Sequence, residues 1–412
     1  MARGRPALAE LANPAMLPDP YPVLAGLREA SPFPEAGGAL VVVGRHEDCS
    51  RILRDPRSSS ERGRSLLSPP PTSPSPFTAR AASFLSLDPP DHTRLRRLVS
   101  KAFTPRVIAA LAPRIRELAH GLLTAAADGS GGRREIEIVS QLAYPLPVRI
   151  ISELLGVPAT DHARFAGWSA RLAHSLQPQF GPADPGEAAA VQEARLEFAD
   201  YFRELIAIRR ARPAADLLSQ LIRAEDDGQY LSEQELIGTC VLLLVAGHET
   251  TVGLISNAVL ALLRHQDQLA ALRANPKLAA AAVEETLRYD APVQFTGRVA
   301  RGGMQIGPVS APDGAVLMLL LAATGRDPAV YADPDRFDIR RTAAGGPGHL
   351  AFAAGPHFCL GAPLARLEAT IALQTFVTRV AGPELDEAGL AYKPNVNLRG
   401  PERLPVRFAG IR

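Results

Sequence analysis

The stretch from Ser232 to about His265 constrains the possible folds of this chain most strongly. Ser232 and Glu235 form the Ser-x-x-Glu pattern of a capping box, which predicts the start of a helix. The helical pattern that follows covers about 34 residues, or about 50 Å, and its middle, LIGTCVLLLVAG, is apolar on nearly every face. A helix of this kind crosses the interior of a protein. Its most strongly apolar run, 240–247, is far shorter than the roughly 20 residues of a membrane span, so we predict a core helix.

Composition and charge are typical of a soluble globular protein. The chain has 412 residues, 46% of them hydrophobic, and 45 basic residues nearly balance 43 acidic ones, so net charge indicates no nucleic-acid partner. Length alone favours two or three domains. Cys49, Cys240 and Cys359 lie far apart and match neither a zinc nor a disulfide pattern. Because the N-terminus has no apolar run, we expect a cytoplasmic protein that contacts no membrane. The predominance of arginine over lysine favours a GC-rich bacterial source.

Polar residues interrupt the core helix at 246–251, which contains the sequence AGHETT. A buried Glu249 is costly unless it has a partner or a task. Thr250 in mid-helix can bond to the carbonyl four residues earlier and bend the helix. From the residues alone, both a kinked helix with a satisfied glutamate and a functional acid–alcohol pair remain open.

A second informative stretch surrounds Cys359, in the sequence HLAFAAGPHFCLGAPLARLEA. It contains the pattern F-x-x-G-x-H-x-C-x-G, formed by Phe352, Gly355, His357, Cys359 and Gly361. A helical pattern follows at once, so Cys359 lies near a helix N-terminus, where the dipole favours the metal-binding thiolate. Glycines suit a backbone that passes close to a flat, bulky cofactor. The alternative for a lone cysteine is a buried core thiol.

Two charged pairs share helix faces. His92 and Arg96 are four residues apart after Asp91, a plausible N-cap, and such pairs are most often solvated. Glu285 and Arg288 form E-x-x-R, which on a surface is worth a few tenths of a kcal/mol.

The remaining chain indicates many helices and few strands. We expect an extended lead-in over 1–20 and a flexible Pro-rich loop over 58–83. Helices are expected at 23–30, 46–53, 108–126, 142–155, 161–175, 187–212 and 216–224, with a loop at 177–186. Strands are expected at 40–43, on both sides of the turn 312–314, and at 404–408.

Taken together, five motifs between residues 87 and 405 resemble, in order, those of the cytochrome P-450 family of haem-thiolate monooxygenases. One departure is Ala353, where the family most often has glycine, and we expect only slightly looser packing there. The resemblance implies a mainly α fold with a small β subdomain, formed by residues 1–412 as a single triangular domain. This expectation overrides the estimate from length.

The resemblance also implies which residues hold haem b and substrate. Cys359 is the expected iron ligand, and four residues, His92, Arg96, Arg298 and His357, are expected at the haem propionates. The full set expected at the cofactor is His92, Arg96, Ala246, Arg298, Phe352, His357, Cys359 and Gly361. Substrate contacts are expected from Leu243, Ala246, Val293, Phe295 and Val396.

Two further roles follow from the resemblance. Glu249 and Thr250 are expected to be catalytic and to deliver protons while dioxygen is activated. Glu285 and Arg288 are expected to form a buried pair, completed by Arg336 in the sequence DPDRF, that holds the haem loop in shape.

The implied activity is insertion of one oxygen atom from O2 into a hydrophobic small molecule, by hydroxylation or epoxidation, in secondary metabolism. Expected partners are a ferredoxin and an NAD(P)H-dependent ferredoxin reductase, with the protein itself a monomer. Arg94, Arg97 and Lys101 are expected to form a basic patch for the acidic carrier. Two alternatives are a peroxide-driven peroxygenase, which usually lacks the acid–alcohol pair, and a non-catalytic haem-binding sensor.

Overall fold

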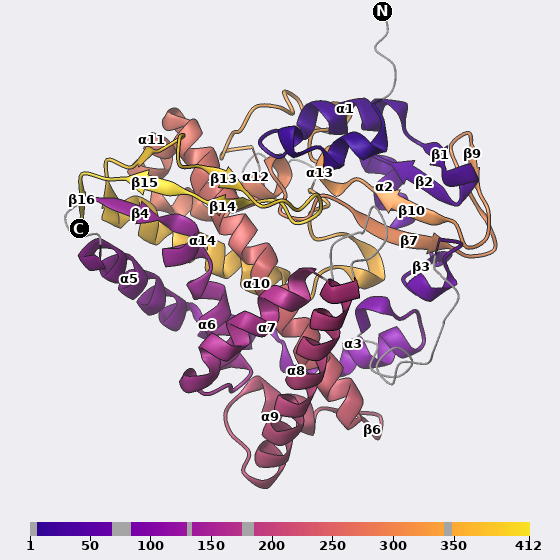
Figure 1. Ribbon diagram of the computed structural model, residues 1–412, viewed down its shortest axis with the longest axis horizontal. Helices are drawn as coiled ribbons and strands as arrows, with labels where there is room; N and C mark the ends of the chain where they lie inside the picture. The colour runs from indigo at the N-terminus through magenta and orange to yellow at the C-terminus, as the bar shows by residue number, and fades with distance from the viewer. Residues whose placement is uncertain (1–5, 68–83, 130–133, 175–184, 342–347) are drawn as a thin grey trace, which may run out of the picture. The chain divides into compact units, whose positions relative to one another are not determined.

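The computed structural model describes residues 6–67, 84–129, 134–174, 185–341 and 348–412 (Figure 1). They group into two compact units, which are described separately below. Unit 1 comprises Met1–Ser68, Arg114–Ala143 and Thr250–Arg412, and unit 2 comprises Pro69–Pro113 and Tyr144–Glu249. Both units are mainly helical, and most strands belong to unit 1.

A five-stranded sheet organises unit 1, in the order β1-β2-β10-β7-β3 (Figure 1). Its strands are β1 (Phe33–Glu35), β2 (Leu40–Val43), β10 (Val316–Leu319), β7 (Thr296–Ala300) and β3 (Ser58–Ser59). Strands β2 and β10 pair in parallel, with Val41 opposite Leu317 and Val42 opposite Met318, and the other pairs are antiparallel. The strand predicted at 40–43 is confirmed.

Both faces of this sheet are buried. Val41 and Val43 pack on one face with Ile52 of α2 (His46–Ile52). Val42 points to the other face and packs with Leu24 and Leu27 of α1 (Tyr21–Ala30). This alternation follows from the period of two in a strand, and it explains why β2 has four apolar residues in a row.

Short antiparallel ladders complete the β structure of unit 1. They involve β4 (Glu135–Glu137), β8 (Met304–Ile306), β9 (Val309–Ala311), β11 (Val380–Ala381), β12 (Glu384–Leu385), β13 (Ala391–Tyr392), β14 (Pro401–Arg403), β15 (Pro405–Arg407) and β16 (Gly410–Ile411). The turn 312–314 connects β9 with β10, and β15 lies within the strand predicted at 404–408, as expected. Outside named strands, Val293 forms an antiparallel bridge with Leu398.

The further helices of unit 1 are α5 (Ala112–Gly129), α11 (Gln266–Ala274), α12 (Ala279–Tyr289), α13 (Leu321–Thr324) and α14 (Ala362–Arg379). Helix α14 packs against both α11 and α12. The loop that carries Cys359 therefore precedes a helix anchored on two others.

Unit 2 is built from helices around an aromatic cluster. Its elements are α3 (Asp91–Ala102), α4 (Pro105–Ala110), α6 (Pro145–Leu154), α7 (His162–His174), α8 (Pro185–Ala211), α9 (Leu217–Arg223) and the hairpin of β5 (Glu225–Asp226) and β6 (Gln229–Tyr230). Helix α7 packs on α8 through Phe165, Trp168, Phe198 and Phe202, whose ring centroids lie 4.9–5.8 Å apart in five pairs. Three of the five pairs meet edge to face and two are tilted, and aromatic rings prefer such geometries to face-to-face stacking.

The predicted core helix is confirmed as α10 (Glu233–Arg264). Ser232 donates its N–H to the Glu235 carboxylate at 2.8 Å, and Glu235 donates back to the Ser232 hydroxyl at 3.3 Å, so the capping box is present. By length and composition α10 could cross a membrane, but 67% of its most apolar window is buried inside the protein. Helix α10 contributes residues to both units, with Glu249 the last in unit 2 and Thr250 the first in unit 1.

The lead-in predicted as extended is instead folded. It forms 3-10 turns at Leu8–Ala12 and Pro14–Met16, and the Asn13 side chain caps the second by accepting the Ala15 N–H at 3.0 Å. Leu11 is buried in the sheet core, and this burial stabilises the turns.

Two other predicted boundaries are wrong for reasons of local chemistry. The helix predicted over 108–126 is divided between α4 and α5, because Pro113 in a continuous helix would clash with the carbonyl four residues earlier. Likewise a π-turn at Val139–Ala143 precedes α6, which begins at Pro145.

The first part of the Pro-rich loop is ordered, since β3 pairs with β7 and Leu66 donates to Gly314 O at 2.9 Å. Residues 68–83, and most of the loop predicted at 177–186, lie outside the described residues.

Candidate functional site

Cys359 lies at the entrance to α14, as the sequence predicted. A 3-10 turn at Gly355–His357 precedes it, Gly361 occupies the N-cap position, and a proline follows in the first turn of the helix. The Cys359 N–H donates to the carbonyl of Phe352 at 3.0 Å, which closes the loop on itself. This geometry leaves the sulfur close to the first N–H groups of a long helix, where a thiolate is favoured.

Exposure separates the three thiols. Cys49 and Cys240 are completely buried, and burial raises the pKa of each thiol far above its usual range. Cys359 is only partly buried. The first two are therefore core thiols, whereas the alternative of a buried core thiol does not describe Cys359.

The two glycines of the loop, Gly355 and Gly361, have different surroundings. Gly355 has φ +70°, and a Cβ there would lie 2.4 Å from the carbonyl oxygen of Leu53, so contact with the end of α2 requires glycine. At Gly361 an added Cβ would lie 3.8 Å from the Cys359 sulfur, an ordinary contact. Only Gly361 is thus available for close approach of a cofactor to the backbone.

Ala353 departs from what we expected of it. Its φ is +57°, in the left-handed region. An alanine there costs roughly 1 kcal/mol, because its Cβ approaches the carbonyl oxygen. The position therefore carries backbone strain rather than the slightly looser packing that we predicted.

The E-x-x-R pair is buried, which overturns its interpretation as a surface pair. Arg288, 2% exposed, donates through Nε and Nη2 to Glu285, 0% exposed, at 2.8 and 2.7 Å. The Arg288 Nη1 also donates to Gly325 O and Pro334 O, both at 2.7 Å. Glu285 in turn accepts the Asp338 N–H at 2.8 Å. Such complete satisfaction is what makes a buried ion pair tolerable.

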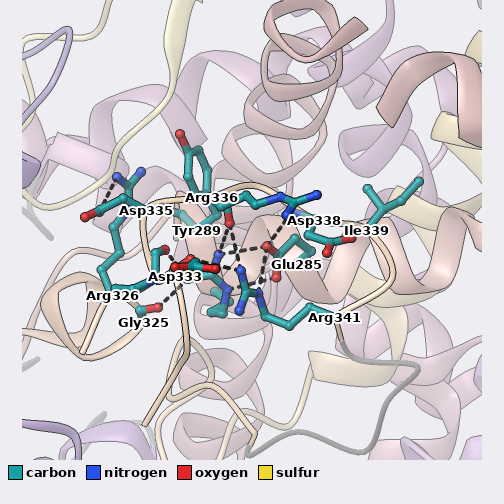
Figure 2. Close-up of polar contacts among 12 residues, drawn as sticks. Glu285, Tyr289, Gly325, Arg326, Asp333, Asp335, Arg336, Asp338, Ile339 and Arg341 are labelled. Atoms are coloured by element: carbon teal, nitrogen blue, oxygen red, sulfur yellow. Dashed lines mark hydrogen bonds and ion pairs between the residues drawn. The ribbon is translucent and has the colours of Figure 1, made fainter. Parts of the chain in front are cut away.

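The third member of this network is Arg341, so the prediction of Arg336 is wrong. Arg341 donates from Nε to Glu285 Oε1 at 3.3 Å. Among the contacts drawn in Figure 2, Arg336 supplies its carbonyl oxygen, which accepts from Arg288 at 2.9 Å and from Arg341 at 3.0 Å. The irregular backbone after β10 and α13 turns the Arg336 side chain outward, where it is exposed.

The residues predicted at the propionates occur in both units. Arg298 on β7 is buried and donates to Gly297 O at 2.8 Å, and His357, partly buried, lies in the same loop as Cys359. In unit 2, His92 of α3 is buried with its ring centroid 6.4 Å from that of Phe84, and Arg96 follows one turn later. The meeting of these two sets stays a prediction.

Glu249 has a neighbour that sequence reasoning missed. His248 is fully buried, its Nδ1 lies 2.9 Å from Leu244 O, and its Nε2 lies 3.5 Å from Glu249 Oε1. The Tyr144 ring packs edge-on against His248, with centroids 5.8 Å apart. Burial, and then the charge of Glu249, raise the pKa of Tyr144. The adjacent position in the sequence was the only signal for His248.

Of the residues predicted at the substrate, the structure brings Phe295 and Val396 together. Both line a shallow pocket of unit 1 whose other walls are Leu11, Met16, Leu17, Pro20, Leu24, Gln294, Asn395 and Arg399. Val293 is partly buried and packs against the core cluster of the sheet, and its contact with substrate stays a prediction. Leu243 and Ala246 belong to α10 in unit 2. The N-terminal turns, missed as structure from the sequence, thus form much of this wall.

The predicted basic patch on α3 is internally neutralised. Arg97 and Lys101 donate to Asp226 of the β5–β6 hairpin at 2.8 and 2.7 Å, and Arg94 pairs with Glu235. The bonds from Lys101 and then Arg97 lower the pKa of Asp226. An acidic partner would therefore compete with carboxylates of the chain itself.

The donor groups present fit an iron porphyrin. Within the described ranges, no group of three or more His, Cys, Asp or Glu could hold a metal ion by protein ligands alone. Unit 1 instead offers one accessible thiol, a soft ligand suited to haem iron. It also offers Arg298 and His357, side chains able to hydrogen-bond carboxylates.

Known proteins resemble this chain over nearly its whole length. A family model described as Cytochrome P450 matches residues 37–380. The cytochrome P450 monooxygenase PikC of Streptomyces venezuelae is 42% identical, covering 95% of this chain and 91% of that protein. The vitamin D(3) 25-hydroxylase of Pseudonocardia autotrophica is 40% identical, covering 94% and 93%. The ligand-free crystal structure of Mycobacterium smegmatis CYP164A2 is 44% identical, with TM-score 0.87 and coverage of 97% and 99%. This likeness confirms the predicted fold, mainly α with a small β region.

Proposed function

The chain belongs to the cytochrome P450 family of monooxygenases, and from this premise we propose that it inserts one oxygen atom from O2 into a hydrophobic small molecule. The cofactor of the family is haem b, which when bound supplies the activation of dioxygen. One observation carries the proposal for this chain: Cys359 is a partly exposed thiol at the start of α14, while the other two thiols are buried.

The residues around Cys359 hold the cofactor in this proposal. Cys359 ligates the iron as thiolate, and Phe352 and Gly361 flank it within the loop. Arg298, His357, His92 and Arg96 hold the two propionates by charge-assisted hydrogen bonds. Ala246, on α10, has a side chain small enough to leave room beside the cofactor.

Proton delivery is assigned to Glu249 and Thr250, consecutive residues of α10. A carboxylate can take protons from solvent and a hydroxyl can pass them on, provided both lie within hydrogen-bond reach of the acceptor. The 3.5 Å contact of His248 with Glu249 supports this role, because it gives the carboxylate a fixed neighbour on the same helix. These two residues are catalytic in the proposal, and His248 is a positioning residue.

We propose a medium-sized hydrophobic natural product as substrate, such as a polyketide, terpenoid or modified peptide of secondary metabolism. The apolar character of Phe295 and Val396, which are neighbours in unit 1, supports this class, whereas the cavity of about 20 Å³ beside them is far too small to hold such a substrate. Leu243, Ala246 and Val293 complete the proposed contacts. Two polar side chains beside these residues are engaged within the protein: Gln294 donates to Ala291 O at 2.7 Å, and the Asn397 side chain accepts the Phe295 N–H at 3.1 Å. Both hydroxylation and epoxidation suit such a site.

The electron donors in this proposal are a ferredoxin and an NAD(P)H-dependent ferredoxin reductase. The supporting features are Arg97 and Lys101 of α3, whose side chains are 59% and 46% exposed and so can be reached by an acidic carrier that displaces their shared partner Asp226. We also propose that the protein is a cytoplasmic monomer and a single functional domain.

The test is a difference spectrum of the dithionite-reduced protein with and without carbon monoxide. A strongly red-shifted Soret band in the wild type, lost in Cys359→Ser and kept in Cys49→Ala, is the expected result. Oxidation of NAD(P)H coupled to product, with ferredoxin and its reductase present, then separates an enzyme from a sensor. A band at the shorter wavelength of histidine-ligated haem in the wild type, or no haem, would refute the proposal.

A further inference from the structure

Glu284, the residue before the buried Glu285, makes a separate ion pair. It accepts from Arg366 Nε at 2.6 Å and Nη2 at 3.0 Å, and its Oε2 lies 3.3 Å from His349 Nε2. The three side chains come from α12, α14 and the segment before the Cys359 loop. Burial alone raises the pKa of Glu284, but the bonds from His349 and Arg366 outweigh it and lower the pKa to about 2. The carboxylate is therefore a permanent anion.

The tautomer of His349 follows from the partner of its other ring nitrogen. Nδ1 accepts the N–H of Ala351 at 3.2 Å, so it carries no proton. The ring proton then resides on Nε2 and points to Glu284. His349, whose side chain is 6% exposed, contacts Glu284 with one ring nitrogen and the Ala351 N–H with the other. It therefore connects the anion to the backbone at the start of the loop.

Arg366 and His349 both contact Phe352. The guanidinium carbon of Arg366 lies 4.6 Å from the centroid of the Phe352 ring, and the His349 ring lies 5.9 Å away. The carbonyl of Phe352 is the acceptor for the Cys359 N–H. A continuous set of contacts thus leads from Glu284 through Arg366 and Phe352 to the backbone of Cys359.

We infer that Glu284, His349 and Arg366 are positioning residues for Cys359, which they serve by holding Phe352 and thereby the Cys359 N–H. The inference rests on the proposed role of Cys359 as thiolate ligand. Ligand orientation by such outer groups tunes a metal centre, because hydrogen bonding around a thiolate changes its donation to the metal. Glu284 is distinct in this from Glu285, which binds Arg288 of the same helix and also accepts from Asp338 and Arg341.

The planarity of Arg366 is essential to the arrangement. Its guanidinium binds Glu284 with two nitrogens and lies over an aromatic ring, two contacts that a lysine cannot make together. Glu284 and Arg366 have side-chain exposures of 29% and 35%, so the pair adds only modestly to global stability. Its effect should therefore be seen at the loop rather than in the unfolding of the protein.

The experiment compares Glu284→Gln with Glu387→Gln in the haem-loaded enzyme. Glu387 is a matched control: it accepts from Arg264 Nε at 3.2 Å and Nη2 at 3.1 Å, in a pair far in sequence from the loop. We expect the red-shifted carbon monoxide complex of Glu284→Gln to convert to the shorter-wavelength form about tenfold faster than that of wild type. This factor corresponds to a barrier lower by about 1.4 kcal/mol. The iron reduction potential should also shift. Glu387→Gln should match wild type in both, and Arg366→Lys should resemble Glu284→Gln.

Two outcomes are distinguishable. If wild type gives the red-shifted band but Glu284→Gln and Arg366→Lys keep its conversion rate and potential, the inference is overturned and the proposed function stands. If wild type itself gives no such band, the proposed function fails first. Melting temperatures of both glutamine variants provide the check on folding, and we expect them to differ little from each other.

Discussion

Replacing Arg341 with alanine tests which arginine completes the buried network. Arg341 donates to Glu285 at 3.3 Å, to Ala332 O at 2.5 Å, and to Asp333 O and Arg336 O at 3.0 Å each. Its side chain is 17% exposed. Four hydrogen bonds at a net value of about 1 kcal/mol each, less about 2 kcal/mol of side-chain entropy regained, predict a loss of about 2 kcal/mol.

The matched control is Arg336→Ala. This variant keeps the backbone carbonyl that accepts from Arg288 and Arg341, so its unfolding free energy should stay within about 0.5 kcal/mol of wild type. Thermal unfolding followed by circular dichroism measures both, with a decrease of about 2 °C in melting temperature expected for Arg341→Ala. A larger loss in Arg336→Ala than in Arg341→Ala would refute the structural assignment and restore the assignment made from the DPDRF sequence.

Four further outcomes are expected. Ala353→Gly removes the strain of an alanine with positive φ and should stabilise the folded state by about 0.5 kcal/mol, which raises the melting temperature. A melting temperature below that of wild type would show that no strain is stored there. Asp226→Asn frees Arg97 and Lys101 and should strengthen ferredoxin binding about threefold at low salt. The control Asp227→Asn makes the same charge change at the next residue and should leave the binding constant, measured by titration calorimetry, unchanged. Burial raises the pKa of Glu368 to about 8, so the folded state holds a proton that the unfolded state releases near its usual 4.5; stability should fall as pH rises between these values, and urea titrations of Glu368→Gln should lack that slope. Thr250→Ala should keep haem and substrate but divert electrons into peroxide, and an unchanged product yield per electron would contradict its role in proton transfer.

Local chemistry explains what was predictable from the sequence. The capping box and continuous apolar pattern of α10 involve neighbours three or four residues apart, and its bounds, Glu233–Arg264, differ from the prediction by one residue at each end. The position of Cys359 before α14 was likewise contained in the F-x-x-G-x-H-x-C-x-G pattern. Pro113 lies in the first turn of α5, where its missing N–H costs little, but we did not apply this rule to the helix predicted over 108–126.

Tertiary structure alone decided which charged groups meet. Arg336 and Arg341 are five residues apart in an irregular segment, so no periodicity could indicate which side chain turns toward Glu285. The same holds for Glu284 with Arg366, 82 positions apart, and for Asp226 with the cations of α3. Helical and strand patterns arise from interactions between near neighbours, which the sequence by itself contains. Ion pairs across long loops depend on the path of the whole backbone, and that path is set only when the core has packed.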